Sequence, residues 1–210
     1  MRYLKLLGLA AVAAMALTAF FGAGSASATT LCTQTETPCA AGNQYTLTQD
    51  NIIEASLEAG TTAVLKNTSG SIEDTCNTSS IKAELTNSGG AAATVAGKVT
   101  EIAFGGCTNT TSVNNAATCT FEVHNVANTD HGTLTGSGCT VGVVAFGFPC
   151  WWSAANGTHL GTVTGGSMAT LDIKAVVQRV DQSSFLCPST AIWEANYTVT
   201  KPTGGMYVEP

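Results

Sequence analysis

Eight cysteines constrain the fold of this chain more than any other feature, at positions 32, 39, 76, 107, 119, 139, 150 and 187. An even number of cysteines in an exported chain predicts disulfides, because thiols are not kept reduced outside the cytoplasm. A metal site would favour C-x-x-C pairs or cysteines close to histidines, and neither spacing occurs, so we expect no metal. Many connectivities are open, and the pairing we predict is Cys32–Cys39, Cys76–Cys107, Cys139–Cys150 and Cys119–Cys187.

The N-terminal stretch predicts a signal peptide of bacterial type over residues 1–28. Arg2 and Lys5 precede an uncharged apolar run, and Ala26-Ser27-Ala28 has the small-x-small pattern of a cleavage site. The apolar run is short for a membrane span. We therefore expect cleavage after Ala28, one disulfide-rich domain over residues 29–210, and no membrane insertion after the leader is removed. The expected location is extracellular, with loose attachment to the cell wall as a variant.

Charge excludes one class of partner. Without Arg2 and Lys5, six basic residues face fourteen acidic ones, a net charge of −8. The acidic residues are scattered, and no basic stripe exists that could neutralise a phosphate backbone. We expect no nucleic acid as a partner, and an anionic membrane surface is disfavoured for the same reason.

Alternation of apolar and polar residues predicts an all-β fold. The period of two is clear in residues 81–85, 93–104 and 169–177, and it also favours a strand over residues 51–60. A turn is expected at residues 87–90, and a shift of phase near Thr100 suggests a bulge. Short strands separated by glycine-rich turns favour an antiparallel β-sandwich, with a β-barrel as the alternative.

Three segments resemble a known group of proteins. LCTQTETPC at 31–39, the pattern SIKAELTNSGG…GKVTEIAFGGC at 80–107, and the run from Cys187 to Pro210 are similar to small secreted, cysteine-rich β proteins of soil actinobacteria. That family has no assigned activity, so the resemblance implies a secreted β fold and provides no catalytic or binding residues. The tryptophan pair described below departs from its pattern.

Residues suited to catalysis do not form a recognised motif. Asp172, Asp181 and Glu194 lie at the ends or outer faces of expected strands, where paired carboxylates could converge only through the fold. His124 and His131 are separated by a spacing that is not a recurrent ligand pattern. We expect neither catalytic residues nor a cofactor.

The dipeptide Trp151-Trp152 is the strongest candidate for binding. Neighbouring side chains on a strand point to opposite faces, so one indole can enter the core while the other cannot. An exposed indole could stack on a sugar ring or anchor a protein partner, and Phe146 and Phe148 would enlarge the surface.

These features predict a non-catalytic extracellular or envelope-associated protein that binds cell-wall or environmental polysaccharide, or an envelope protein. Two alternatives from other classes stay open. One is a secreted hydrolase whose acids meet only in the fold, and the other is a purely structural envelope protein. A cleft lined by two carboxylates would favour the first, and burial of both tryptophans would favour the second.

Overall fold

The computed structural model describes residues 28–47, 51–70, 72–90, 93–114, 119–127, 129–145 and 148–210, so nearly all of the expected leader lies outside it. Within these ranges the chain is all-β, as the alternation predicted, and its fourteen strands join one antiparallel sheet. A short 3-10 helix covers Ala41–Asn43. The strands are β1 (Thr29–Cys32), β2 (Ile52–Leu57), β3 (Ala63–Asn67), β4 (Ile72–Gly90), β5 (Ala93–Cys107), β6 (Thr110–Asn114), β7 (Thr120–Asn125), β8 (His131–Ser137), β9 (Thr140–Ala145), β10 (Phe148–Ser153), β11 (Thr158–Thr164), β12 (Thr170–Arg179), β13 (Thr190–Lys201) and β14 (Tyr207–Glu209).

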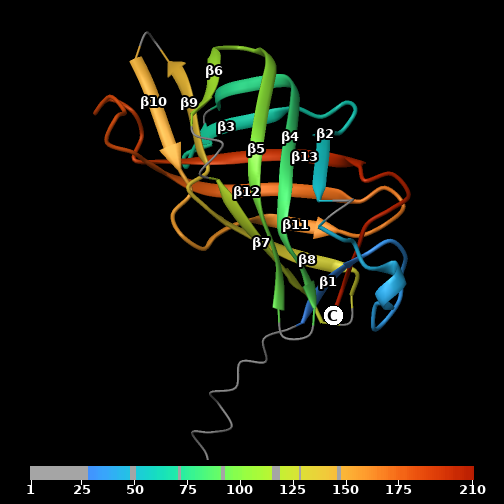
Figure 1. The fold of residues 1–210 in the computed structure, drawn as a ribbon. Coiled ribbons are helices and arrows are strands. Elements are labelled where there is room, and N and C mark those ends of the chain that lie inside the picture. Colours follow the sequence, from blue (N-terminus) through green and yellow to red (C-terminus); the bar gives the residue numbers. More distant parts are fainter. Residues whose placement is uncertain are drawn as a thin grey trace, which may run out of the picture.

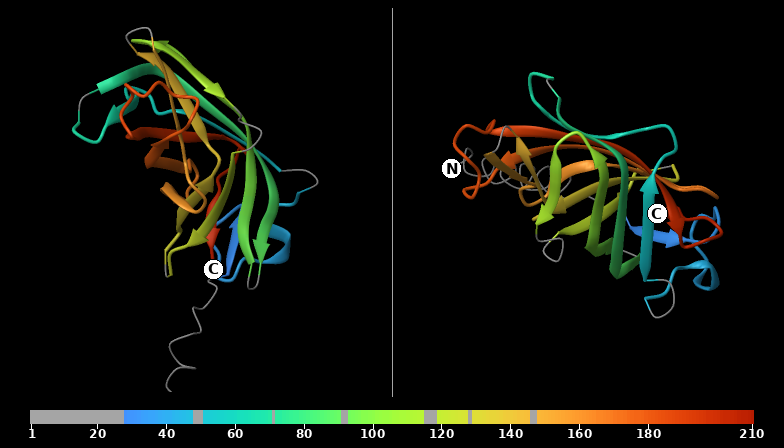
Figure 2. Two further views of the ribbon diagram at one scale, coloured as in Figure 1. Left: turned by 90° about the vertical axis from the view of Figure 1, so that its left-hand side faces the viewer. Right: turned by 90° about the horizontal axis from the view of Figure 1, so that it is seen from above.

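A closed barrel forms the larger part of the sheet (Figure 1, Figure 2). Its ring of hydrogen-bonded strands runs β2–β4–β5–β7–β8–β11–β12–β13, and β13 pairs with β2 to close it. The barrel, the alternative in our prediction, therefore replaces the sandwich. The reason is that pairing continues from β2 round to β13, which leaves the interior enclosed by one sheet rather than packed between two.

The long strands continue beyond the barrel into a second layer at one end, which we call the upper extension. β4 pairs with β2 through residues 80–84 and with β3 through residues 72–76. β13 likewise pairs with both β2 and β3. On the other side, β12 pairs with β10 through its last residues, Gln178 and Arg179. β10 then pairs with β9, and β9 pairs with β6. Figure 1 shows β3, β6, β9 and β10 together above the barrel.

A short ribbon closes the opposite end of the barrel. β1 pairs with β14 and also with the last residues of β4, where Thr30 lies opposite Gly89. Gly89 has a φ of 92°, and a Cβ atom there would lie 1.7 Å from the carbonyl oxygen of Thr29, so only glycine fits. The predicted turn at residues 87–90 is therefore wrong, because this segment belongs to β4 and pairs with β1.

The interior follows the predicted alternation. On β12, Ile173, Ala175 and Val177 are buried, whereas Asp172, Lys174 and Val176, which alternate with them, are exposed. The bulge near Thr100 is confirmed, because Lys82 pairs with Glu101 while Ala83 pairs with Val99.

One polar side chain from β13 lies deep in this interior. Tyr197 is fully buried, and its hydroxyl is 2.9 Å from the hydroxyl of Ser79. Burial raises the pKa of Tyr197 to about 12, so the phenol stays neutral at ordinary pH.

Four disulfides hold the chain, and two of them match the prediction. Cys32–Cys39 and Cys76–Cys107 are present, whereas the other four cysteines pair as Cys119–Cys139 and Cys150–Cys187. The predicted Cys139–Cys150 and Cys119–Cys187 pairs are wrong because of strand register. The β9–β10 hairpin places Cys150 opposite Val143, several residues from Cys139, and β7–β8 pairing brings Cys119 and Cys139 to a Cα separation of 4.3 Å.

Candidate functional site

The two tryptophans of β10 point to opposite sides of the upper extension, as the alternation required. Trp152 is 0% exposed, and its indole Nε1 donates a hydrogen bond of 3.0 Å to the carbonyl oxygen of Pro188. A buried, hydrogen-bonded indole cannot act as a binding platform, so the binding role considered for Trp152 is wrong. Trp151 is half-buried and faces the other way.

The indole of Trp151 lies against a glycine of the neighbouring strand. Trp151 pairs with Gly142 of β9, and a Cβ atom at that glycine would lie 2.0 Å from Cε3 of the ring. The six-membered ring therefore occupies the space that a side chain at position 142 would need. This contact covers one side of the indole and explains why the middle of β9 carries a glycine.

Gly142→Ala is expected to push Trp151 away from β9. Because the added methyl overlaps the ring, the free energy of unfolding should fall by about 1–3 kcal/mol, and iodide should quench the tryptophan fluorescence more strongly. Gly42→Ala is the matched control, since no atom lies within 4 Å of its added Cβ. Unchanged quenching in Gly142→Ala would contradict this packing of Trp151.

The segment after β12 runs along the part of β10 that β12 does not pair with. We call this segment, residues 180–187, the Phe185 loop. Val180 N donates to the carbonyl oxygen of Trp151 (3.0 Å), and Ser184 N donates to that of Pro149 (3.0 Å). The hydroxyl of Ser183 lies 2.7 Å from Trp151 N, which donates to it. The loop thus continues the role of β12 as the neighbour of β10.

The Phe185 loop ends in a tight turn that is fixed from several sides. Cys187 N donates to the carbonyl oxygen of Ser184 (3.0 Å), which places Phe185 and Leu186 at the two central positions of a turn. The guanidinium Nη1 of Arg179 donates to the carbonyl oxygens of Phe185 (3.0 Å) and Cys187 (2.6 Å). The disulfide from Cys187 to Cys150 on β10 completes the attachment.

Large apolar side chains remain exposed around this attachment. Phe185 is 85% exposed and Leu186 is 58% exposed, and the adjacent β9–β10 hairpin adds Phe148 at 45% and Val144 at 42%. The register of β9 and β10 puts Phe148 and Val144 on opposite faces of this hairpin, so we give the name apolar tip to Phe185 and Leu186 alone. Figure 1 shows the loop, in orange-red, beside β10 at the left edge of the upper extension. Phe146, the remaining predicted binding residue, lies outside the described residues.

Phe185 and Leu186 were not predicted as binding residues. Their segment, SSFLCP, has no period of two or of 3.6, so it matches neither the strand pattern nor the helix pattern. A usable signal was present nonetheless. Two large apolar residues stand between serines and a cysteine, where a connecting loop is usually polar.

The carboxylates and histidines considered for catalysis lie on outer surfaces. Glu194 forms ion pairs with Lys66 and with Lys174 (3.6 Å), and the hydrogen bond from Lys66 holds its pKa below the usual value. A carboxyl group kept ionised in this way is unsuited to act as a general acid. Asp172 is exposed on β12, and Asp181 is exposed in the Phe185 loop.

The two histidines each lie beside an acidic residue of their own segment. His124 on β7 is 3.4 Å from Glu122, and His131 on β8 is 3.5 Å from Asp130. Both contacts are at the surface of the barrel, where such pairs contribute little.

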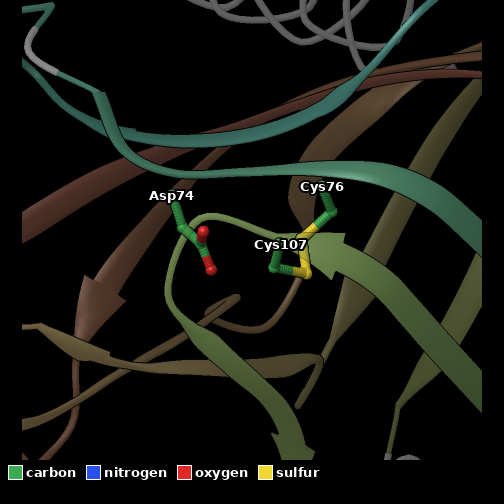
Figure 3. A group of neighbouring side chains, drawn as sticks. All are labelled: Asp74, Cys76 and Cys107. Atoms are coloured by element: carbon green, nitrogen blue, oxygen red, sulfur yellow. A yellow bond between two sulfur atoms is a disulfide. The ribbon is translucent and has the colours of Figure 1, made fainter.

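A buried group of Asp74, Cys76 and Cys107 has a spacing that would suit a metal ion (Figure 3). The two sulfur atoms form a disulfide and so offer no thiolate. The Oδ1 atom of Asp74 accepts hydrogen bonds from Thr108 Oγ1 (2.7 Å), Thr75 N (2.9 Å) and Asn109 N (2.9 Å). These contacts connect the start of β4 to the segment after β5, so the group has a structural explanation.

Comparison with protein-family models, curated proteins and solved structures gives no match. Among the described residues, no helical segment is long and apolar enough to cross a membrane. The function proposed below therefore rests on the geometry of the apolar tip.

Proposed function

We propose that this chain is a non-catalytic extracellular binding module that docks onto a protein partner through the apolar tip. The observation that carries the proposal is the exposure of Phe185 (85%) and Leu186 (58%) at the centre of a turn that is fixed to β10. Adjacent exposed apolar side chains of this size usually mark a contact surface. The four disulfides support an extracellular location, where such bonds persist.

The attachment of the loop favours tight binding. Hydrogen bonds from Val180, Ser184 and Arg179 and the Cys150–Cys187 disulfide hold the tip before any partner arrives. Because the loop is already ordered, binding a partner does not require a further loss of its conformational entropy. Aromatic side chains that enter a pocket on a partner are the usual centres of binding energy.

The chemistry of the tip indicates what kind of partner fits. Its two side chains carry no charge, and Leu186 lacks the flat face that stacks on a sugar ring. The net charge of −6 over the whole chain disfavours an anionic surface. The best match is an apolar pocket on a protein of the cell envelope.

Polysaccharide is the second candidate, and the packing of Trp151 on Gly142 favours it. The ring of Trp151 rests on Gly142, and because Trp151 is only half-buried, part of the indole remains available to stack on a sugar ring. This candidate requires Trp151, whereas docking on a protein requires Phe185 and Leu186.

The test uses residues 29–210 of the oxidised protein and its variants as bait. It compares the proteins that each variant captures from an envelope extract of the producing organism. The amount of a partner protein that the wild type captures should fall at least tenfold when Phe185→Ser and Leu186→Ser are combined. Val176→Ser is the matched control, because Val176 is 48% exposed on β12, outside the apolar tip. Equal capture by the double variant would overturn the proposal. Retention of wall polysaccharide that Trp151→Ala abolishes would favour the second candidate.

A further inference from the structure

The barrel contains a cavity of about 80 Å³ whose surface is entirely apolar. Every strand of the closed ring contributes to its wall, and examples are Ile53 on β2, Val99 on β5, Leu134 on β8 and Ile173 on β12. Leu31 of β1 extends the wall at the end where the β1–β14 ribbon lies. The space belongs to the barrel as a whole, and neither residue of the apolar tip lines it.

No polar atom of the described residues reaches the surface of this cavity. Trp193 is the one lining residue with a nitrogen atom in its side chain, and its ring contributes carbon atoms alone. Cys119 and Cys139 also line the space, but they form a disulfide and offer no thiol. A buried water molecule needs about two to four polar partners, so water is a poor occupant. A molecule with a charge or a hydrogen-bonding group would lose its partners in water without replacement.

Small side chains keep the centre of the barrel open. Ala55 on β2 and Ala83 on β4 both line the cavity, and each pairs with an isoleucine of the other strand. On the facing part of the wall, the ring of Phe121 lies back against Gly97, where a Cβ atom would lie 2.4 Å from Cζ of the ring. Protein interiors are usually close-packed, with few spaces larger than a water molecule. A space of this size therefore provides room for a guest.

We infer that the barrel binds a small hydrocarbon in this cavity. The observation that carries the inference is the complete absence of polar surface among the described residues that line the space. An empty cavity forfeits the dispersion contacts that its wall could make, and a hydrocarbon restores them. The guest also removes its own apolar surface from water, which is the main source of affinity for such a molecule.

The volume limits the size of the guest. Apolar cavities of about 150 Å³ hold benzene, and a water-sized group needs about 10–15 Å³, so this cavity holds about three to eight non-hydrogen atoms. Short branched or cyclic hydrocarbons, such as cyclopentane or an isoprene-sized alkene, fall within this range. Fatty acids and other long amphiphiles exceed it. The site is independent of the function proposed for the apolar tip.

The experiment titrates cyclopentane into residues 29–210 of the oxidised protein and follows the isoleucine methyl signals by nuclear magnetic resonance. Saturable shifts are expected for the four isoleucines that line the cavity: Ile53, Ile81, Ile102 and Ile173. Ile52 and Ile192 do not line it, and their signals should stay unchanged. Tetrahydrofuran has the same ring size but carries an ether oxygen. It should bind at least about tenfold more weakly, because that oxygen finds no donor in the cavity.

Matched alanine variants place the guest in the cavity. Ala55→Val adds two methyl groups to the lining and should weaken cyclopentane binding about tenfold. Ala96→Val makes the same change on β5 outside the lining and should leave the affinity unchanged, as should the combination of Phe185→Ser and Leu186→Ser.

Three results would overturn the inference. The first is the lack of a saturable shift in the folded wild type. The second is equal affinity for cyclopentane and tetrahydrofuran, which would contradict an apolar site. The third is unchanged binding in a folded Ala55→Val variant, which would place the guest elsewhere.

Discussion

Replacing Trp152 by alanine is expected to lower the free energy of unfolding by about 3–5 kcal/mol. The side chain is 0% exposed, so its removal leaves a large cavity in the upper extension. The substitution also removes the donor to the carbonyl oxygen of Pro188, the residue that follows the Phe185 loop. Urea denaturation followed by far-ultraviolet circular dichroism measures the change.

The neighbouring residue provides the control. Trp151→Ala removes an indole of the same size from the opposite face, where it is half-buried on Gly142. Its effect should be clearly smaller, since surface substitutions usually change stability by about 0.5 kcal/mol and partial burial adds to that. Equal destabilisation by the two variants would contradict the different environments assigned to the two tryptophans.

The double variant Cys150→Ala, Cys187→Ala is expected to lose about 3–4 kcal/mol of stability. This bond closes a segment with a sequence separation of 37, and a long closed loop restricts the unfolded chain strongly. The folded state changes as well, because the turn at Phe185 then depends on Arg179 and on hydrogen bonds to β10. Thermal unfolding in the oxidised state measures the loss of stability.

Limited digestion with chymotrypsin tests the loss of local order. Phe185 and Leu186 suit this protease, but a tight turn does not present the extended backbone that it cleaves, so the wild type should resist. The double variant should be cut at residues 185–186. Cys32→Ala, Cys39→Ala is the control: its separation of 7 predicts a loss of about 2 kcal/mol and no new cleavage there. Cutting of the wild type at the same site would disprove the rigid turn.

Local patterns in the sequence predicted much of the fold. Single side chains and their neighbours are enough to predict the alternation in β12 and the strand at β2. The same holds for two disulfides, Cys32–Cys39, whose cysteines are close in sequence, and Cys76–Cys107, which joins the ends of a hairpin. Barrel and sandwich share this alternation. The difference between them depends on whether β13 meets β2, a contact between residues far apart in the chain.

The candidate site was predictable only in part, for a related reason. Alternation required Trp151 and Trp152 to face opposite ways, but the buried face is determined by the partners β9 and β12. The remaining disulfides depend on the same registers. Phe185 and Leu186 belong to no periodic element, and their place beside β10 follows from the Cys150–Cys187 bond, which the sequence did not reveal.

Closure of the barrel by β13 has a consequence for how the protein folds. β13 is the neighbour of β2, β3 and β12, and β14 is the neighbour of β1, although both strands come at the end of the chain. A chain still being synthesised lacks these partners, so the preceding strands would present open edges and an exposed interior. Pairing between distant segments is also slow. Nascent chains of this protein should therefore depend on a protecting chaperone until β13 and β14 have emerged.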